Sequence, residues 1–261
     1  MKMNFKLVSN IVIKASIEEL LPRFSTVSGK IKSDGSIVTE ADLSMQNCLQ
    51  KELLDAFPGT TLLSEEMTVN EQEAALDSGK PVWCLDPLDG TSNYAAGIPY
   101  FAVSLSLIQN KEVIMGLVYD PVRDECFFAE KNMPAMLNNN KIELTDKFDD
   151  ISRSIAIVDL KRLDSHLSTR LVQEQPFASQ RNFGASALDW CWLAIHRGQL
   201  YLHGKQNIWD YSAGHFIFQK AGGYSSTLDA EPVFSNKLEG RSVVAAVNKP
   251  LFDNWFNWIK K

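Results

Sequence analysis

Cysteine and histidine are scarce in this chain of 261 residues. The four cysteines, Cys48, Cys84, Cys126 and Cys191, lie far apart and form no C-x-x-C pair. Isolated cysteines in apolar stretches are typical of reduced core residues, which argues against a disulfide framework and against a zinc site. The four histidines show no ligand spacing either.

Long hydrophobic runs are also missing. No stretch reaches the roughly 20 apolar residues that cross a bilayer. The apolar run near the N-terminus is interrupted by Ser9, Asn10 and Lys14 and offers no small-residue cleavage site, so no signal peptide is predicted. We therefore expect a soluble, intracellular protein of the cytoplasm that has no membrane partner.

Basic blocks are the third absence. The formal charge is −6, from 26 basic and 32 acidic residues. An acidic chain without a basic block is a poor nucleic-acid binder and repels anionic membrane surfaces, so no nucleic acid is required as a partner. If the ligand is an anion, the site must bring in cations to neutralise it.

The composition itself is that of an ordinary globular protein, with 45% hydrophobic and 22% charged residues, which excludes disorder. At this size roughly three-quarters of the unfolded surface should be buried, enough for one large core or two lobes. Helical spacing covers residues 4–28 and 42–57, a strand is predicted at 80–85, and a hairpin is predicted at 101–119. Strands and helical segments alternate in the second half, which predicts a lobe boundary within residues 135–155.

Carboxylates gather where the predicted strands end. They are Asp42, Glu65, Glu66, Asp86 and Asp89, and a further carboxylate, Asp210, lies at the start of a predicted helix. Pro87 prevents a regular helix through D-P-L-D-G-T, so we expect the aspartates on either side of it to converge from a tight turn. Burying both of them without cations would be costly. Acidic side chains without basic partners favour a hard cation that binds oxygen, which indicates Mg²⁺ rather than zinc.

These segments resemble the inositol monophosphatase family, within the lithium-sensitive, magnesium-dependent phosphatase superfamily. The family pattern D-P-[IL]-D-G-T-x-N-[FY] is matched by residues 86–94, and W-D-x-x-A-G is matched by residues 209–214. The E-E pair of the family corresponds to Glu65-Glu66, and its V-T-x-x-D corresponds to residues 38–42. The order and spacing of the motifs fit over most of the chain.

The resemblance implies an α+β fold, a layered α-β-α-β-α sandwich of two closely packed lobes. Residues 1–145 would form an N-terminal α+β lobe that carries most of the metal ligands. Residues 146–261 would form a C-terminal α/β lobe that supplies Asp210 and substrate contacts. The resemblance also implies a homodimer.

The resemblance further implies a role for each site residue. The ligands of two or three Mg²⁺ ions would be Glu65, Asp86, the Leu88 carbonyl, Asp89 and Asp210. Thr91 and Asp42 would orient the attacking water, and Glu65 would join them in catalysis. The backbone N–H groups of Gly90 and Thr91 would hold phosphate oxygens. The phosphate and substrate contacts would be Asp89, Gly90, Thr91, Arg181, Gly184, Ala185, His203 and Asp210.

The implied reaction is hydrolysis of a small phosphate monoester, myo-inositol 1-phosphate or a similar polyol phosphate, by metal-activated water. Histidinol phosphate, fructose 1,6-bisphosphate and adenosine 3′,5′-bisphosphate remain alternatives within the superfamily. A regulatory or scaffold role on the same fold is a further alternative. A phosphatase that forms an aspartyl-phosphate is disfavoured, because its motif is D-x-D-G-T and this chain has D-x-x-D-G-T.

One position departs from the family pattern. His203 stands where many members carry a glutamate that accepts hydrogen bonds from substrate hydroxyls. A neutral imidazole offers one acceptor and one donor, whereas a carboxylate offers two acceptor oxygens. If His203 contacts the substrate, we expect weak discrimination between inositol phosphate and simpler esters.

Overall fold

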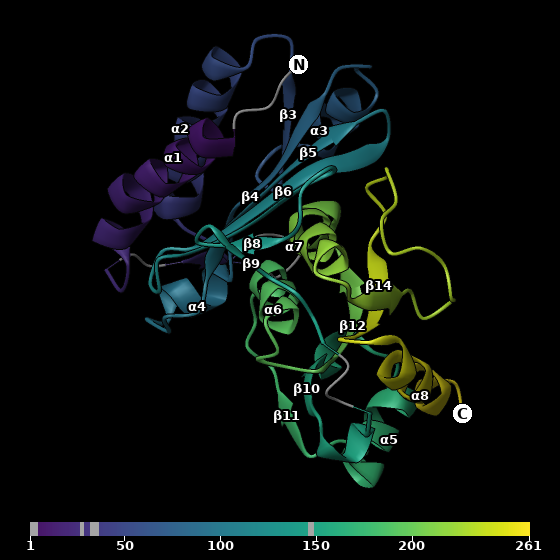
Figure 1. Cartoon of the computed structure of the whole chain (residues 1–261). Coiled ribbons are helices and arrows are strands. Elements are labelled where there is room, and N and C mark those ends of the chain that lie inside the picture. The colour runs from purple at the N-terminus through teal and green to yellow at the C-terminus, as the bar shows by residue number, and fades with distance from the viewer. Residues whose placement is uncertain (1–4, 27–28, 32–36, 146–148) are drawn as a thin grey trace.

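The computed structural model describes residues 5–26, 29–31, 37–145 and 149–261. Its helices and two main sheets form five layers in the order α-β-α-β-α (Figure 1), as predicted. Two helices cover the outer face of the first sheet, two lie between the sheets, and two cover the outer face of the second. In that order the pairs are α1 (Phe5–Ala15) with α2 (Glu40–Ala56), α6 (Ser186–Ala194) with α7 (Ile208–Lys220), and α5 (Ser165–Glu174) with α8 (Lys249–Lys260).

The first sheet has seven strands in sequence order. They are β3 (Thr61–Ser64), β4 (Val82–Asp89), β5 (Ala102–Gln109), β6 (Glu112–Asp120), β7 (Glu125–Glu130), β8 (Met136–Leu137) and β9 (Asn140–Lys141). Only β3 and β4 pair in parallel, with α3 (Val69–Leu76) connecting them. The predicted hairpin is confirmed: Asn110 and Lys111 turn between β5 and β6 with φ of 52° and 62°, the backbone that two-residue hairpin turns require.

The second sheet has five strands in the order β11-β10-β12-β14-β13. They are β10 (Ile155–Asp159), β11 (Ser179–Arg181), β12 (Leu200–Gln206), β13 (Tyr224–Ser226) and β14 (Arg241–Ala246). Strand β10 runs parallel to both β11 and β12, so the carboxyl ends of these three strands lie at one edge. The strands β1 (Lys30–Ile31) and β2 (Ile37–Val38) pair in antiparallel orientation as a separate two-stranded sheet.

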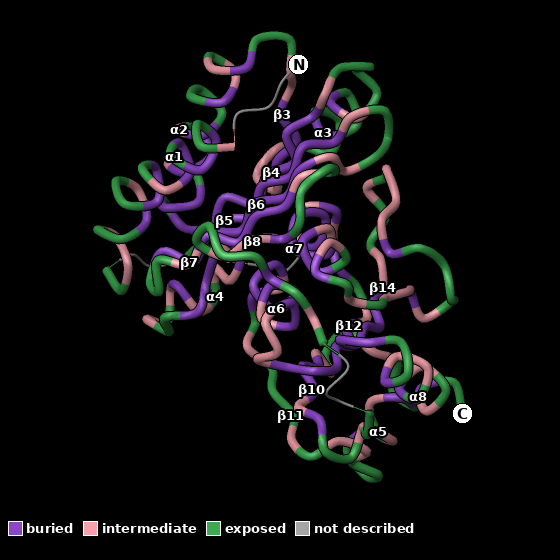
Figure 2. The backbone as a smooth tube through the Cα atoms, viewed as in Figure 1, coloured by how far each residue is buried: buried purple, intermediate pink, exposed green. Residues whose placement is uncertain are grey.

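The buried residues follow this layering (Figure 2). Helices α6 and α7 pack against both sheets, so the two halves of the chain share one central core. Its largest members include Trp190 of α6 and Phe218 of α7, both fully buried. Burying a side chain of this size stabilises the fold by about 1.5–3 kcal/mol. The central helices are thereby fixed against the sheet that carries Asp86 and Asp89.

Two sequence predictions need correction. The helix expected over residues 4–28 ends as α1 at Ala15 and continues as a π-helical turn, Ser16–Leu20, and a 3₁₀ turn, Leu21–Arg23; residues 4, 27 and 28 lie outside the described residues. Pro22 lacks a backbone N–H, and an α-helix cannot continue regularly through it. The tight turn expected around Pro87 is instead an irregular stretch of β4, whose pairing with β5 shifts register between Asp86 and Asp89.

The chain passes from the first sheet to the second between β9 and β10. The first sheet ends at Lys141 and the second begins at Ile155, while residues 146–148 lie outside the described residues. None of the helices in the described parts of the chain is long and apolar enough to cross a membrane.

Candidate active site

The parallel pair β3 and β4 brings two of the predicted carboxylates to one edge of the first sheet. Glu65 directly follows β3, and its N–H donates to the Leu85 carbonyl of β4 at 3.2 Å. Asp86 is the next residue along β4 and is 2% exposed. Its Oδ1 accepts a hydrogen bond from the Leu88 N–H at 3.0 Å. The intervening Pro87 has no N–H and donates no such bond. The parallel pairing therefore places Glu65, just after β3, beside Asp86 at the point of β4 where its pairing with β3 ends.

Asp89 is held by a helix from the other half of the chain. Its Oδ1 accepts from the Ser186 N–H at 3.0 Å, and its Oδ2 accepts from the Ala187 N–H at 2.7 Å. These donors belong to the first turn of α6, where N–H groups have no partner within the helix and the helix dipole favours negative charge. The register shift in β4 aims Asp89 at this helix.

Asp210 comes from the start of the second central helix. It is the third residue of α7, and its Oδ2 accepts from the N–H of Asn207, the N-cap residue, at 2.7 Å. This is the capping-box arrangement, in which the third helical side chain reaches back to the cap. The carboxylate is thus fixed by the local sequence N-I-W-D.

The carboxylates share one electrostatic environment. Burial, followed by the charges of Glu65, Asp89 and Asp210, raises the pKa of Asp86 well above its ordinary value. Burial also raises the pKa of Asp89 and of Asp210 to about 7, although backbone N–H bonds act to lower both. Each carboxyl group therefore resists ionising beside the others.

Such a group fits a divalent cation by its donor chemistry. The donors are carboxylate and carbonyl oxygens, the ligands that Mg²⁺ prefers. In the described ranges, Asp86, Asp89 and Asp210 form no ion pair with a basic side chain, and Arg162 acts only to lower the pKa of Asp210 against the larger effect of burial. Within those ranges, no group of three or more His, Cys, Asp or Glu side chains is already arranged to hold a metal ion.

Asp42 and Thr91 form the other part of the site. Asp42 is the third residue of α2 and is 1% exposed. Its Oδ2 accepts from the N–H and hydroxyl of Thr39 at 2.7 and 2.6 Å, and its Oδ1 faces the Thr91 hydroxyl at 2.9 Å. The same hydroxyl lies 2.9 Å from the Leu88 carbonyl. Burial raises the pKa of Asp42, against the opposing effect of these hydrogen bonds.

The glycine and alanine positions predicted to bind phosphate or substrate lie together. Gly90 has φ of +91°, and a Cβ there would lie 3.0 Å from both the Ala185 Cβ and the Tyr100 carbonyl oxygen. Both the backbone and the space therefore require glycine. Asn93 closes the arrangement, since its Nδ2 donates to the Tyr100 and Phe183 carbonyls at 2.8 and 2.7 Å. Gly184, with φ of +79°, faces the Asn93 side chain.

Two of the predicted substrate residues are engaged elsewhere. The exposed Arg181 lies on the edge strand β11, where its guanidinium donates to the Ser179 hydroxyl and the Gln180 carbonyl. His203 is 8% exposed, its Nδ1 accepts from the Lys205 N–H at 3.1 Å, and its Nε2 lies 3.1 Å from Asp159. Both ring nitrogens are thus occupied, and a substrate hydroxyl would have to displace one of these partners. The geometry does not favour the direct contact expected from the sequence.

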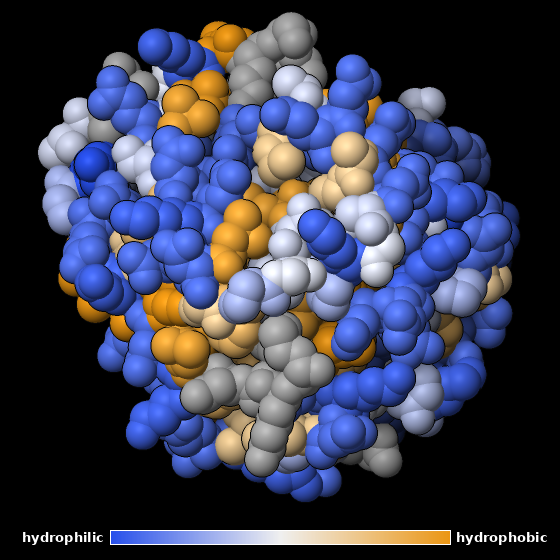
Figure 3. Space-filling model, turned by 90° about the horizontal axis from the view of Figure 1, so that it is seen from above, coloured by the Kyte–Doolittle hydropathy of each residue, from blue (hydrophilic) through white to orange (hydrophobic). Residues whose placement is uncertain are grey.

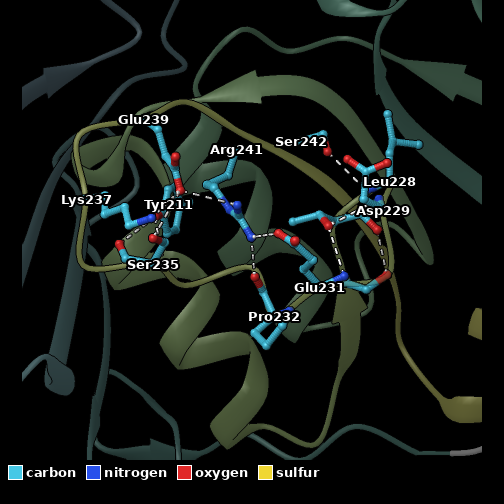
Figure 4. Close-up of polar contacts among 12 residues, drawn as sticks. Tyr211, Leu228, Asp229, Glu231, Pro232, Ser235, Lys237, Glu239, Arg241 and Ser242 are labelled. Carbon is cyan, nitrogen blue, oxygen red and sulfur yellow. Dashed lines mark hydrogen bonds and ion pairs between the residues drawn. The ribbon is translucent and has the colours of Figure 1, made fainter.

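A loop that sequence reasoning missed supports the helix bearing Asp210. Tyr211 follows Asp210, and its hydroxyl lies between the carbonyl and the N–H of Ser235, at 3.3 and 3.4 Å (Figure 4). Arg241 fixes the other end of the same loop by donating to Glu231 at 2.8 Å and to the Pro232 carbonyl at 2.9 Å. No short motif marks these contacts, because they join residues 9 to 24 positions apart.

The fold and the carboxylate cluster together define a layered α+β protein whose site is suited to a divalent cation and an anionic ligand. The chain belongs to the inositol monophosphatase family, whose model matches residues 3–256. An inositol-1-monophosphatase from Mesorhizobium japonicum is 29% identical over 233 residues, covering 85% of this chain and 86% of that protein. A protein named Nus factor SuhB from Xylella fastidiosa is 31% identical over 204 residues, covering 74% and 70%.

Solved structures show the same fold. The extragenic suppressor protein SuhB from Bartonella henselae matches with a TM-score of 0.86 and 24% identity, covering 98% of both chains. A structure described as an IMPase/NADP phosphatase complexed with Mg²⁺ and phosphate matches with a TM-score of 0.83 and 21% identity, covering 97% and 93%. The predicted fold class and family are therefore confirmed.

Proposed function

We propose that this protein is a magnesium-dependent phosphatase that hydrolyses a small phosphate monoester, with myo-inositol 1-phosphate or a similar polyol phosphate as the first substrate to test. The observation that carries the proposal is the group formed by the buried Asp86 and Asp89 with the half-buried Asp210, none of which forms an ion pair with a basic side chain within the described residues. The curated relatives named inositol monophosphatase and the Mg²⁺–phosphate complex of a structural neighbour support it.

The residues that would hold two or three Mg²⁺ ions are Glu65, Asp86, the Leu88 carbonyl, Asp89 and Asp210. When bound, such ions lower the pKa of a water and stabilise the attacking and leaving oxygens of an in-line displacement. Gly90 is the N-cap residue of α4 (Thr91–Ala95), and Thr91 is its first residue. The N–H groups of these two residues would hold phosphate oxygens.

Asp42 and Thr91 would orient the attacking water. The Thr91 hydroxyl donates a hydrogen bond to Asp42 or to the Leu88 carbonyl, whose oxygens are both 2.9 Å away. Its oxygen lone pairs are then left to accept an O–H of the water. Since Asp42 is itself fixed by two bonds from Thr39, the Thr91 hydroxyl has a defined direction. Glu65, which directly follows β3, would take part in catalysis with Asp42 and Thr91.

Phosphate release from a panel of esters tests the proposal. The panel contains myo-inositol 1-phosphate, histidinol phosphate, fructose 1,6-bisphosphate and adenosine 3′,5′-bisphosphate, each with Mg²⁺ and with a chelator. We expect phosphate release that depends on Mg²⁺. The kcat/KM values then show which of the four esters is the preferred substrate. The Asp55→Asn variant, an exposed position on α2, serves as the control for an ordinary surface substitution.

A second candidate is a regulatory role on the same fold. The relatives named Nus factor SuhB, which match at 30–31% identity, favour it. A variant that folds but lacks phosphatase activity separates the two candidates. If it replaces the normal protein in the cell, the regulatory role is the main one.

We also propose that the protein acts in the cytoplasm as a homodimer. Ile98 and Val122 are 49% and 40% exposed and lie near one another, because Arg123 donates to the Pro99 carbonyl at 3.0 Å. Such an apolar pair is suited to a subunit contact. The face seen in Figure 3 carries several separate hydrophobic areas among hydrophilic residues. Light scattering on the normal protein and on Ile98→Glu tests the assembly.

A further inference from the structure

The candidate metal ligands come from separate elements, and a buried serine connects two of these elements. Asp86 belongs to β4, and Asp210 is the third residue of α7. Ser104 of β5 pairs with Asp86 in the first sheet, so the two side chains lie on the same face. The Ser104 hydroxyl donates to the Trp209 carbonyl of α7 at 3.0 Å. Since Asp210 directly follows Trp209, one hydrogen bond connects the sheet that carries Asp86 to the helix that carries Asp210.

A second serine of the same strand makes a different kind of contact. Ser106 lies two residues further along β5, on the same face, and its hydroxyl oxygen lies 2.8 Å from that of Ser212 in α7. Both partners of this bond are side chains, whereas Ser104 holds a backbone carbonyl. Ser104 and Ser106 are equally and fully buried. The two serines therefore differ in what their hydroxyl groups hold rather than in their burial.

The backbone of α7 lies directly on the first sheet beside Ser106 (Figure 1). Gly116 of β6 pairs with Ser106, and a Cβ at Gly116 would lie 2.7 Å from the Ala213 carbonyl oxygen. The close approach of the two backbones sets the position of α7 at this turn. The loss of the Ser106 hydroxyl should therefore leave the helix in place. Ser104 acts one turn earlier, at the residue before Asp210.

We propose that Ser104 is a positioning residue of the metal site, because its bond to the Trp209 carbonyl sets where Asp210 lies relative to Asp86. This inference rests on the proposed function and adds to it a residue that acts through the backbone of α7. A carbonyl oxygen has two lone pairs, so the Trp209 carbonyl can accept from Ser104 and also from the N–H four residues further along the helix. A fully buried hydroxyl requires such an acceptor.

Calorimetric titration with Mg²⁺ tests the inference without turnover. Ser104→Ala should weaken Mg²⁺ binding about tenfold, the lower end of the losses that follow removal of a group that orients a metal ligand. The matched control is Ser106→Ala, which removes an equally buried hydroxyl from the same face of the same strand. This control should keep a nearly normal Mg²⁺ affinity. Urea unfolding should show that both variants lose stability, because each loses one buried hydrogen bond.

Steady-state kinetics supply a second readout. For Ser104→Ala, the Mg²⁺ concentration that gives half the maximal rate should rise about tenfold, while kcat at saturating Mg²⁺ stays close to normal because every ligand is still present. Ser104→Cys nearly keeps the volume of serine but offers only a weak S–H donor, so its Mg²⁺ affinity should fall between those of Ser104→Ala and the unsubstituted protein. If Ser104→Ala does not fold, the same titration of Ser104→Cys decides the inference.

The outcomes separate this inference from the proposed function. A normal Mg²⁺ affinity in the Ser104 variants, or an equal loss in Ser106→Ala, overturns the inference while the phosphatase activity stands. If the unsubstituted protein binds Mg²⁺ but hydrolyses no ester, the proposed function fails, and the titrations still decide the role of Ser104. If the unsubstituted protein binds no Mg²⁺, both are rejected.

Discussion

The Asp89 carboxylate lies 2.7 Å from the backbone nitrogen of Ala187, 98 residues further along the chain. The first of these residues belongs to β4 of the seven-stranded sheet, and the second belongs to α6 between the sheets. One side chain therefore connects β4, which lies between β3 and β5 in the first sheet, to the first turn of a helix that lies between the sheets. The bond also ties the position of one candidate ligand to the packing of the two halves of the protein.

Replacing Asp89 with asparagine should abolish most of the activity. The amide keeps the shape but loses a negative charge and one acceptor oxygen, so that it can no longer serve both a cation and the α6 donors. We expect kcat/KM to fall by at least about 10²-fold, because a cation that stabilises the transition state supplies several kcal/mol. Steady-state kinetics at saturating Mg²⁺ check this. Activity equal to that of the Asp55→Asn control would remove Asp89 from the ligand set.

Thr91→Ala should separate water positioning from metal binding. The hydroxyl lies between Asp42 and the Leu88 carbonyl, so its loss should lower kcat strongly and leave Mg²⁺ affinity close to normal. Thr91→Ser, which restores the hydroxyl, should recover much of the rate. Weakened Mg²⁺ binding with an intact kcat would show that Thr91 serves the metal rather than the water.

The metal-free protein should lose stability as the pH rises. Asp89 and Asp210 have folded-state pKa values of about 7, above the ordinary 3.8. Their contribution is therefore fully present below the unfolded pKa and is lost as the pH rises from about 4 to about 7. Mg²⁺ removes the penalty, so the rise in Tm on adding Mg²⁺ should be larger by about 3 °C or more at about pH 8 than at about pH 5. Differential scanning calorimetry measures both, and a rise in Tm that does not depend on pH would contradict the assignment.

His203→Ala should destabilise the fold rather than change the chemistry. The substitution leaves the Lys205 N–H and Asp159 without their ring partners in a half-buried place, which should lower the free energy of unfolding by about 1 kcal/mol. In a double-mutant cycle, His203 and Asp159→Asn should couple by about 0.5 kcal/mol or more. Urea unfolding measures these energies. Additive effects would show that the pair does not interact in solution.

The sequence predicts the parts of this architecture that rest on local chemistry. The strands that carry Glu65 and Asp86 to the site, the position of Asp210 at the start of a helix, and the hairpin at Asn110 follow from short-range rules of strand, cap and turn. The family resemblance, carried by two motifs, adds the layered fold. The wrong element predictions arose at Pro22 and Pro87, where a proline interrupts one element without showing which irregular backbone replaces it.

The remaining features depend on contacts between distant segments. No pattern near Asp89 indicates that Ser186 and Ala187 will donate to it, and nothing near His203 reveals that Asp159 occupies its ring. Gly204 gave a weak signal, because a glycine inside a strand often marks a close backbone approach. The partner that approaches, the Arg162 carbonyl, becomes visible only when β10 and β12 are paired.

The central claim is that the buried carboxylates make this chain a magnesium-dependent phosphatase. Its most direct test is phosphate release from the four-ester panel, measured with Mg²⁺, with a chelator, and after Mg²⁺ is restored. The account predicts turnover of at least one ester that the chelator abolishes, that Mg²⁺ restores, and that Asp89→Asn lacks. Turnover that persists in the chelator, or no turnover of any ester by the folded protein with Mg²⁺, would contradict it.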